Sequence, residues 1–349
     1  MYFRALISAL IFVSLFVKTG ISNDVHPFPE KDSLISSIDS NYIVNYTERF
    51  SARLFLLFQN ASLMINTPNI DKIVYRPNVN VKIGLAANWK WFGLGFSIDN
   101  PFYKRNEGKF GHTSTIDLRA TAFSRKFAAE LLFQRYTGFY ISDPERANGK
   151  NYIIADMSTF SVGIAGFWIY NSSRFSIRAA FIQTEKQKKS AGSLIVRPSF
   201  SFYTISSDNG IIPKELIIEY DIPSSSQIIK GDFYAIGLSP GYIYTFVFLK
   251  NMYVTAAILP GVAAQIHSYH NNKGNYSDFE FSFQLGGRFA LGYNSDAWFI
   301  GGSYQAGFNT IPDKLSNAMF NYDVAQLRVW GGARLDIFRK KKSVPLLTK

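Results

Sequence analysis

The sequence predicts an all-β protein, a single antiparallel transmembrane β-barrel of about 14 strands that follows an N-terminal signal peptide. Three observations predict this class. Apolar and polar residues alternate over long segments, which is typical of strands with two unlike faces. Only 18% of the 349 residues are charged, 16% are aromatic and the mean hydropathy is −0.01, which excludes both a bundle of membrane helices and intrinsic disorder. The chain has no cysteine, so disulfide frameworks and thiolate chemistry are excluded as well.

The first residues have the pattern of an export signal. Arg4 precedes an apolar stretch over residues 5–17, and small residues follow up to Ser22. A basic start, a short apolar core and small residues are typical of a secretory signal peptide, and the stretch is shorter than the ~20 residues of a spanning helix. We therefore expect a signal peptide at 1–22 and a periplasmic N-terminal extension at 23–49.

The barrel is expected over residues 50–338, followed by a basic periplasmic tail at 339–349. Alternation is clearest from Phe279 to Asn294, where large apolar residues occupy one face and polar or small residues the other. A tilted strand needs about 9–11 residues to cross a bilayer, and this segment is longer than a usual globular strand. A soluble β-sandwich would show the same alternation with shorter strands, and it stays open as the alternative fold. Further alternating segments run over 79–88, 115–122, 252–267 and 325–337.

The connections predict the number of strands. Outer-membrane barrels alternate short periplasmic turns with longer outer loops. This alternation is kept across residues 207–231 only if Glu215–Asp221 is a short strand, which gives about 14 strands. If that segment is a loop, another assignment is wrong and 12 strands are expected. The tight turns are expected at 89–90, 124–126, 171–173, 250–251 and 294–297, and the longer breaks at 60–78, 100–111, 139–156, 186–192, 268–277 and 310–322.

Four short motifs resemble an uncharacterised family of outer-membrane barrels from Bacteroidetes-type bacteria, known as a domain of unknown function. They are Tyr75-Arg76-Pro77-Asn78, Asn88-Trp89-Lys90-Trp91-Phe92-Gly93-Leu94-Gly95, Arg135-Tyr136-Thr137-Gly138-Phe139-Tyr140 and Lys188-Lys189-Ser190-Ala191-Gly192-Ser193. Together with the strand pattern, the resemblance covers nearly the whole mature chain. It implies location and architecture, and it implies no catalytic residue.

A set of charged residues falls on the face that the alternation directs into the lumen. Charges in a narrow barrel can pair across strands and fill the interior, because an unpaired buried charge is costly. Alternatively, the excess of positive charge lines a polar passage that attracts anionic solutes. The expected lumen-facing charges are Arg53, Lys82, Asp117, Arg119, Glu130, Arg178, Arg197, Glu280, Arg288, Arg328, Arg334 and Asp336.

Aromatic residues gather near the expected strand ends, as in the girdles of membrane barrels. One group is expected at the periplasmic interface and a second at the outer interface, where stacking on carbohydrate is an alternative role. The periplasmic group is Trp89, Trp91, Phe92, Trp168 and Tyr170, and the outer group is Tyr136, Phe139 and Tyr140.

The leading functional prediction is an outer-membrane protein for passive passage of small solutes, anionic ones included. A non-transporting structural or adhesion barrel and an outer-leaflet lipid hydrolase are the alternatives. The hydrolase would need a serine activated by His112 or His267 across strands, and we expect no enzyme. We also expect no cofactor and no metal site. Export and dispersed basic residues argue against nucleic acid. Outer-membrane lipid or lipopolysaccharide is the expected partner, through the basic loops around Lys104, Arg105 and Lys109 and around Lys186, Lys188 and Lys189; protein partners are not indicated.

Overall fold

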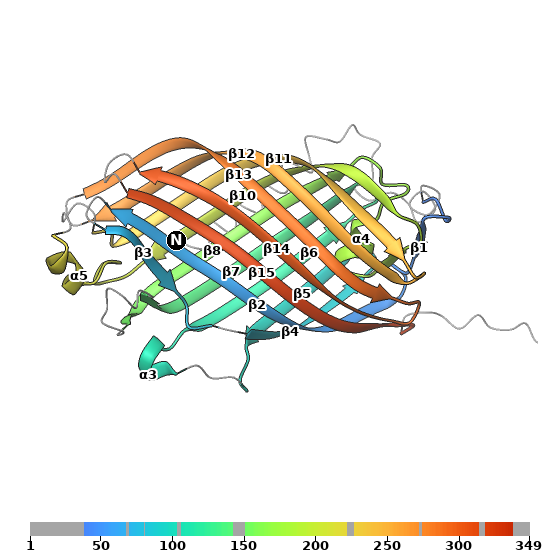
Figure 1. Cartoon of the computed structure of the whole chain (residues 1–349), viewed down its shortest axis with the longest axis horizontal. Helices are drawn as coiled ribbons and strands as arrows, with labels where there is room; N and C mark the ends of the chain where they lie inside the picture. The colour runs from blue at the N-terminus through green and yellow to red at the C-terminus, as the bar shows by residue number, and fades with distance from the viewer. Residues whose placement is uncertain are drawn as a thin grey trace, which may run out of the picture.

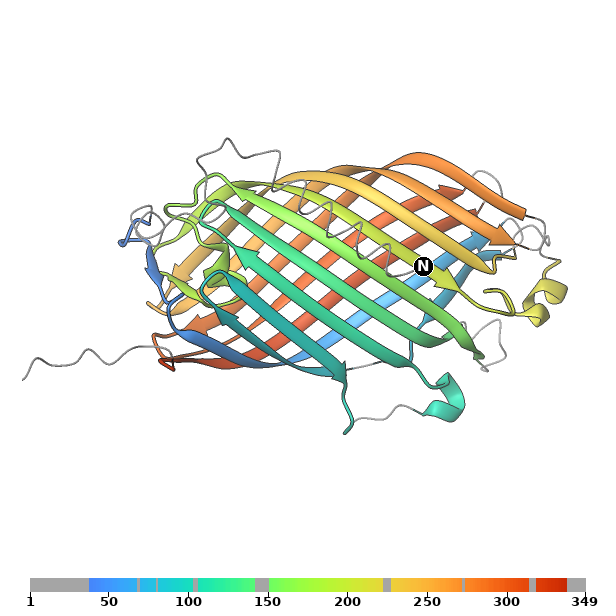
Figure 2. The same cartoon turned by 180° about the vertical axis from the view of Figure 1, so that it is seen from behind.

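The computed structural model describes residues 38–67, 70–79, 81–102, 106–141, 151–221, 227–271, 274–313 and 318–337. The expected signal peptide at 1–22, the part of the extension before residue 38 and the basic tail at 339–349 lie outside these residues. Figures 1 and 2 show the chain from two opposite sides, as tilted strands that surround a lumen.

The alternating segments form one antiparallel sheet that closes on itself. In the described residues this sheet has thirteen strands, of which twelve close the barrel and one, β3, is extra. Closure comes from the pairing of β2 with both β15 and β4 and of β6 with β7. The strands are β2 (Phe50–Thr67), β3 (Ile70–Arg76), β4 (Val81–Trp89), β5 (Phe92–Asp99), β6 (Ser114–Phe123), β7 (Phe127–Ile141), β8 (Tyr152–Ile169), β10 (Ala191–Ser206), β11 (Lys230–Phe248), β12 (Met252–Asn271), β13 (Gly274–Asn294), β14 (Trp298–Asp313) and β15 (Ala318–Leu335).

The predicted all-β antiparallel barrel is confirmed, with 12 barrel strands rather than 14. Two expected strands have other structures. Glu215–Asp221 falls in and after the short helix α5 (Lys214–Glu219), which lies in the connection between β10 and β11. The chain between the expected turn at 171–173 and the expected break at 186–192 forms α4 (Ile177–Phe181) and β9 (Glu185–Gln187). Each of these two errors adds one strand to the prediction, so the predicted number of strands was still even.

The two ends of the barrel differ in their connections. The turns at 90–91, 124–126, 249–251 and 295–297 lie at one end, which we call the turn end. β1 (Ile43–Asn45) lies at this end and pairs with β9. The longer connections, with α3 (Glu107–Phe110) and α5, lie at the opposite loop end (Figure 1).

The pairing of β1 with β9 places a group of lysines at the turn end. Lys186 pairs with Val44, and Lys188 donates a hydrogen bond to the carbonyl of Ser40 at 2.9 Å. The expected place of Lys186, Lys188 and Lys189 in an outer loop, opposite the turns, is therefore wrong.

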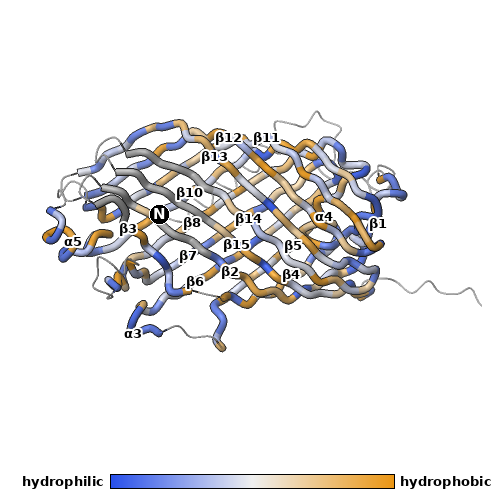
Figure 3. The backbone as a smooth tube through the Cα atoms, in the orientation of Figure 1, coloured by the Kyte–Doolittle hydropathy of each residue, from blue (hydrophilic) through white to orange (hydrophobic). Residues whose placement is uncertain are grey.

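The outer face of the wall is apolar. On β13, Phe281 is 74% exposed while its neighbours Glu280 and Ser282 are buried, and on β4, Leu85 is 67% exposed beside buried Ala86. Colouring by hydropathy shows the same alternation along the strands, with hydrophilic segments at both ends (Figure 3). An apolar outward band is the face that membrane barrels present to lipid. None of the helices in the described ranges is long and apolar enough to cross a bilayer.

The wall is much lower on one side. β4, β5 and β6 have 9, 8 and 10 residues, whereas β11, β12 and β13 have 19, 20 and 21. Above the three short strands, β3 pairs with β2 on one edge and with β7 on the other. In the described ranges, the loop-end half of the wall therefore passes from β2 to β7 through β3.

Two apolar layers fill parts of the interior. The loop-end layer packs Tyr75, Phe233 and Tyr269 of the wall against Ile211 and Ile212 of the β10–β11 connection. The turn-end layer packs Phe167, Ile195 and Ile243 against Phe175 and Ile177, which precede or begin α4. Polar side chains occupy the lumen between these layers.

Candidate functional site: an arginine-lined lumen

A polar belt crosses the middle of the barrel, because alternate residues of each strand face inward. Lys82 on β4 is fully buried and forms an ion pair with Asp117 on β6. Its ammonium group also donates to the hydroxyl of Tyr136 at 2.9 Å. We define the belt by its charged members: Arg53, Lys82, Asp117, Arg119, Glu130, Arg197, Arg288 and Arg328.

One ion pair reaches across the lumen. The two terminal nitrogens of Arg288 on β13 donate to the two carboxylate oxygens of Glu130 on β7, at 3.0 and 2.9 Å. This two-bond geometry fixes both side chains. The predicted pairing of charges across strands therefore describes these two residues and the Lys82–Asp117 pair.

The remaining arginines of the belt form no ion pair within the residues that the structure describes. Arg119 donates to the side-chain oxygen of Gln326 at 3.2 Å. The guanidinium groups of Arg197 and Arg328 lie over the rings of Phe167 and Phe55, at 5.8 and 4.7 Å from the ring centroids. Within the described part of the chain, neither Arg197 nor Arg328 forms an ion pair or a hydrogen bond. Six cations and two carboxylates thus share the belt.

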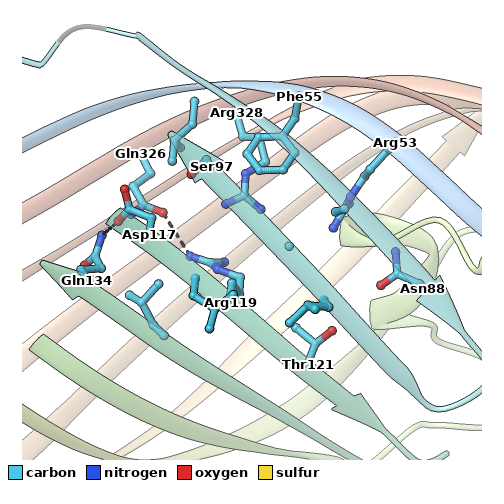
Figure 4. Close-up of a pocket in the computed structure, with 16 residues that line it drawn as sticks. Arg53, Phe55, Asn88, Ser97, Asp117, Arg119, Thr121, Gln134, Gln326 and Arg328 are labelled. Atoms are coloured by element: carbon cyan, nitrogen blue, oxygen red, sulfur yellow. Dashed lines mark hydrogen bonds between the residues drawn. The ribbon is translucent and has the colours of Figure 1, made fainter. Parts of the chain in front are cut away.

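Two cavities adjoin these arginines. The larger, which we call the central chamber, has a volume of ≈310 Å³ and is lined by Arg119, Glu130, Arg197 and Arg288. The smaller, of ≈30 Å³, is lined by Arg53, Arg119 and Arg328, and Figure 4 shows Arg119 directed toward Gln326. Both cavities are therefore lined by an excess of positive charge.

Glycines keep the central chamber wide. Gly163, Gly286 and Gly307 line it, and a Cβ atom built on each of them would meet its nearest neighbour only at 3.6 to 4.0 Å. These are ordinary contact distances. Close packing therefore does not require glycine at these positions, and the wall leaves space that side chains would otherwise fill.

A segment of chain closes the lumen at the turn end. We call residues 171–190 the plug; they connect β8 to β10 and carry α4 and β9. The side-chain oxygen of Ser176 caps α4 by accepting a hydrogen bond from the backbone N–H of Ala179 at 3.0 Å. Such a cap favours a helix start at this residue.

The plug is held together by a buried carboxylate. Glu185 accepts two hydrogen bonds from Arg125 in the β6–β7 turn, both at 2.9 Å, and one from Ser176 at 2.5 Å. Arg178 lies 3.8 Å from the same carboxylate and donates to the carbonyl of Phe123 at 2.9 Å. Burial raises the pKa of Glu185, but the charges of Arg125 and Arg178 and these hydrogen bonds outweigh it, and the pKa lies below its ordinary value.

Barrel strands on other sides bind the backbone of the plug. Arg53 on β2 donates to the carbonyl of Phe181 at 2.7 Å. Tyr253 on β12 donates to the carbonyl of Ala180 at 3.0 Å, and Arg334 on β15 to that of Gln183 at 2.9 Å. With the apolar contacts of the turn-end layer, the plug touches the wall around the lumen.

The segment before β2 is fastened to the plug and to the adjacent turns. The hydroxyl of Tyr46 donates to the carboxylate of Asp296. Arg49 forms an ion pair with Asp336 at 3.1 Å, and Arg174 of the plug forms one with Asp39 at 3.4 Å. Residues 38–49 therefore lie under the plug at the turn end.

Most of the predicted lumen charges do face the interior, with two exceptions. Arg178 is buried, but it belongs to α4 of the plug and not to a wall strand. Asp336 follows the last residue of β15, and its side chain is 43% exposed, so its expected lumen position is wrong. Arg334 is buried against the plug, and Glu280 is buried on β13 nearer the loop end.

The two expected aromatic girdles have different outcomes. Tyr136, Phe139 and Tyr140 are all buried, so an outer lipid-facing group at these residues is wrong. Tyr136 faces the lumen, a bulge at Gly138 shifts the register between Thr137 and Phe139, and Phe110 packs on Tyr140 at 5.0 Å. The residues expected at the periplasmic interface are exposed at the turn end: Trp89, Trp91, Phe92, Trp168 and Tyr170.

The histidines considered for catalysis have other neighbours. His112 lies 3.2 Å from Glu107 on the exposed α3 segment. His267 is buried beside the ring of Tyr269, with 5.4 Å between the centroids. Neither the contact of His112 with Glu107 nor that of His267 with Tyr269 involves a serine hydroxyl.

The sequence interpretation missed the plug and the residues that hold it, Arg125 and Tyr253. One signal was present. Gln183, Thr184 and Glu185 are three consecutive polar residues, which interrupt the alternation that a lipid-facing strand requires.

Comparisons with solved structures find barrels of low identity. OmpT, an outer membrane protein of Vibrio cholerae, is 8% identical over 82% of this chain and 97% of its own, with a TM-score of 0.29. The Pseudomonas putida toluene transporter TodX is 10% identical over 86% and 94%, with a TM-score of 0.30. Ail, the attachment invasion locus protein of Yersinia pestis, is 9% identical over 82% and 99%, with a TM-score of 0.21. Similarity at this level carries no function over to this chain.

No functionally curated protein matches the sequence. The closed barrel with its apolar outer face indicates an outer-membrane location, because strands cross a membrane only as closed barrels. The sequence profile of DUF4421, described as a domain of unknown function, matches residues 37–329. A Bacteroidetes-type source stays a prediction. Since the match covers most of the 349 residues, the chain belongs to the DUF4421 family.

Proposed function

We propose that this protein is an outer-membrane barrel that admits small solutes, anionic ones foremost, into a lumen gated by the plug. Short turns face the periplasm in barrels of this kind and longer loops face outward, so the turn end and the plug would face the periplasm. The expected signal peptide and periplasmic extension agree with this orientation.

One observation carries the proposal: the turn end is blocked by a separate chain segment and not by side chains of the wall. A barrel can be filled by its own inward side chains. Here the wall leaves the central chamber empty, and residues 171–190 supply the closure. Moving this one segment would open the lumen without breaking any pairing between barrel strands.

Ion conductance in planar bilayers tests the proposal. We expect few or no conductance steps for the native protein, and regular steps when residues 174–188 are replaced by a short Gly-Ser-Gly turn. Steps should favour anions, because six cations and two carboxylates line the belt. The double variant Arg53→Gln, Tyr253→Phe keeps the chain length and removes two plug contacts. Its conductance is measured instead if the shortened chain does not fold. A folded barrel with its plug removed that still shows no steps would contradict passage.

A non-transporting structural barrel is the second candidate, and the two apolar layers favour it. The loop-end layer covers part of the lumen opposite the plug. If neither layer moves, the protein only spans the membrane. In that case the plug-shortened variant stays silent in the bilayer although it folds, which separates the two candidates.

Contact with outer-membrane lipid is proposed for either candidate function. The exposed apolar face would contact acyl chains, and Lys109 on the exposed α3 would lie near the phosphates of lipopolysaccharide. Replacing Lys109 by Gln should lower the amount of lipopolysaccharide that copurifies. Unchanged copurification would remove α3 as the contact.

A further inference from the structure

We propose that the central chamber is a binding site for a free oxyanion, a phosphate, sulfate or carboxylate group, held by Arg197 and Arg288. This inference rests on the proposed function and names the class of solute. Three arginines and one glutamate line the chamber, so the site carries an excess of two positive charges before a ligand enters.

One aromatic ring lies near both arginines. The guanidinium carbon of Arg288 lies 4.8 Å from the ring centroid of Phe167, and that of Arg197 lies 5.8 Å from the same centroid. Phe167 is itself buried in the turn-end layer. Two like charges are thereby held near one another at one end of the chamber, an arrangement that a bound anion would stabilise.

The two arginines have different roles in this site. Glu130 fixes Arg288 through two hydrogen bonds, so its orientation is set before any ligand binds. Arg197 forms no hydrogen bond within the described residues, and its planar group offers five N–H donors. A guanidinium group matches the two oxygens of a carboxylate or phosphate. Arg197 is therefore the group available to bind an anion directly.

Stability gives no reason for an arginine at position 197. Glu130 lines the same chamber but forms its two hydrogen bonds with Arg288, so Arg197 has no ion pair of its own in the described residues. Such a confined charge costs free energy, and apolar replacement of buried charges is often neutral or stabilising. A barrel that only needed filling would gain by losing this charge. The chamber volume of ≈310 Å³ is at the small end of the roughly 300–1,000 Å³ of ligand pockets. Ser199, Ser239, Gln284 and Gln305 add hydroxyl and amide groups to its lining.

The test compares two variants with a matched control in the full-length protein in detergent micelles. Arg197→Gln removes the available charge, Gly286→Leu fills the chamber without changing charge, and Lys126→Gln removes one charge from an exposed turn. Inorganic phosphate is the probe, titrated by calorimetry and also added during refolding from urea. Short-chain phosphatidic acid is a second probe, which tests a lipid source for the same group.

We expect saturable phosphate binding by the native protein and by Lys126→Gln, at least ten-fold weaker binding by Arg197→Gln, and none by Gly286→Leu. We also expect the urea midpoint of Arg197→Gln without phosphate to equal or exceed that of the native protein. A merely structural arginine would lower it. Phosphate should raise the midpoint of the native protein and leave that of Arg197→Gln unchanged.

Three results would overturn the inference: no saturable binding, equal binding by Arg197→Gln and the native protein, or binding of phosphatidic acid alone. Each differs from failure of the proposed function. If the native protein does not bind phosphate but the plug-shortened variant conducts ions without preferring anions, the site is refuted and passage remains. Phosphate binding with no conductance refutes passage and leaves the site.

Discussion

Replacing Glu185 by Gln should release the plug while the barrel stays closed. The glutamate side chain is 2% exposed and lies between Arg125 and Arg178. Glutamine has nearly the same shape and can still accept a hydrogen bond from Ser176, so the change removes the charge and little else. Two arginines would then remain buried without an acid.

The size of the effect follows from this burial. Removing one partner of a buried ion pair costs about 3–5 kcal/mol because it leaves an uncompensated charge. The retained hydrogen bonds place this variant at the lower limit, about 3 kcal/mol. Each 1.4 kcal/mol is a factor of ten in an equilibrium constant, so the fraction of molecules with an open plug should rise about a hundred-fold.

Amide hydrogen exchange measures this opening directly. We expect the amides of residues 175–187 to exchange about a hundred times faster in Glu185→Gln, with no change in the amides of β11 to β13. Glu48→Gln is the matched control, since it makes the same chemical change at the same end on an exposed side chain. Equal exchange of the plug amides in both variants, or an equal loss of protection in the strands, would refute the reasoning.

Three further predictions concern acid, lipid and the bulge. The pKa of Glu185 is lower in the folded protein than in the unfolded chain, where it is about 4.3. The stability that this carboxylate contributes is therefore complete above the unfolded pKa and is lost as pH falls through the folded pKa. Conductance of the native protein should appear only below about pH 4, and opening above pH 6 would be inconsistent with this carboxylate. Leu85→Lys should make the free energy of folding into lipid vesicles less favourable by about 2–4 kcal/mol, as for a lysine at the bilayer midplane. If residue 85 faced water instead, the same change would alter stability by about 0.5 kcal/mol or less, and urea titration in vesicles distinguishes these two values. Gly138→Ala should destabilise the barrel by about 1–3 kcal/mol, because Gly138 has φ +90° and an added Cβ would lie 2.0 Å from the carbonyl oxygen of His112; a urea midpoint equal to the native one would count against this strain.

Much of the wall could be predicted from sequence, because a strand between lipid and lumen must alternate at every residue. The segment from Phe279 to Asn294 shows this, and its two faces point as expected. The plug could not be predicted in the same way. Phe175, Ile177 and Ile182 bury apolar surface and Arg178 meets an acid, so a segment inside the barrel carries the same mixture of residues as a wall strand.

The site was predictable as a set of residues but not as a set of contacts. Alternation directs Arg197, Arg288 and Glu130 inward, yet only closure of the barrel decides that Arg288 meets Glu130, 158 residues away, while Arg197 meets a ring. The buried aromatic residues after Gly138 show a second limit. A bulge reverses which residues face inward, and the local period of the sequence does not record it.

The unequal height of the wall has a consequence for the surrounding bilayer. At about 3.4 Å per residue and a tilt of about 40°, the 8 residues of β5 rise only about 21 Å, whereas the 21 residues of β13 rise about 55 Å. Acyl chains beside β4 and β5 therefore meet strands below the roughly 25 Å height of a typical apolar band, and β3 continues the wall above them. Lipids compress against a short protein surface, so the membrane around this protein should be thinned on one flank and left at normal thickness on the other.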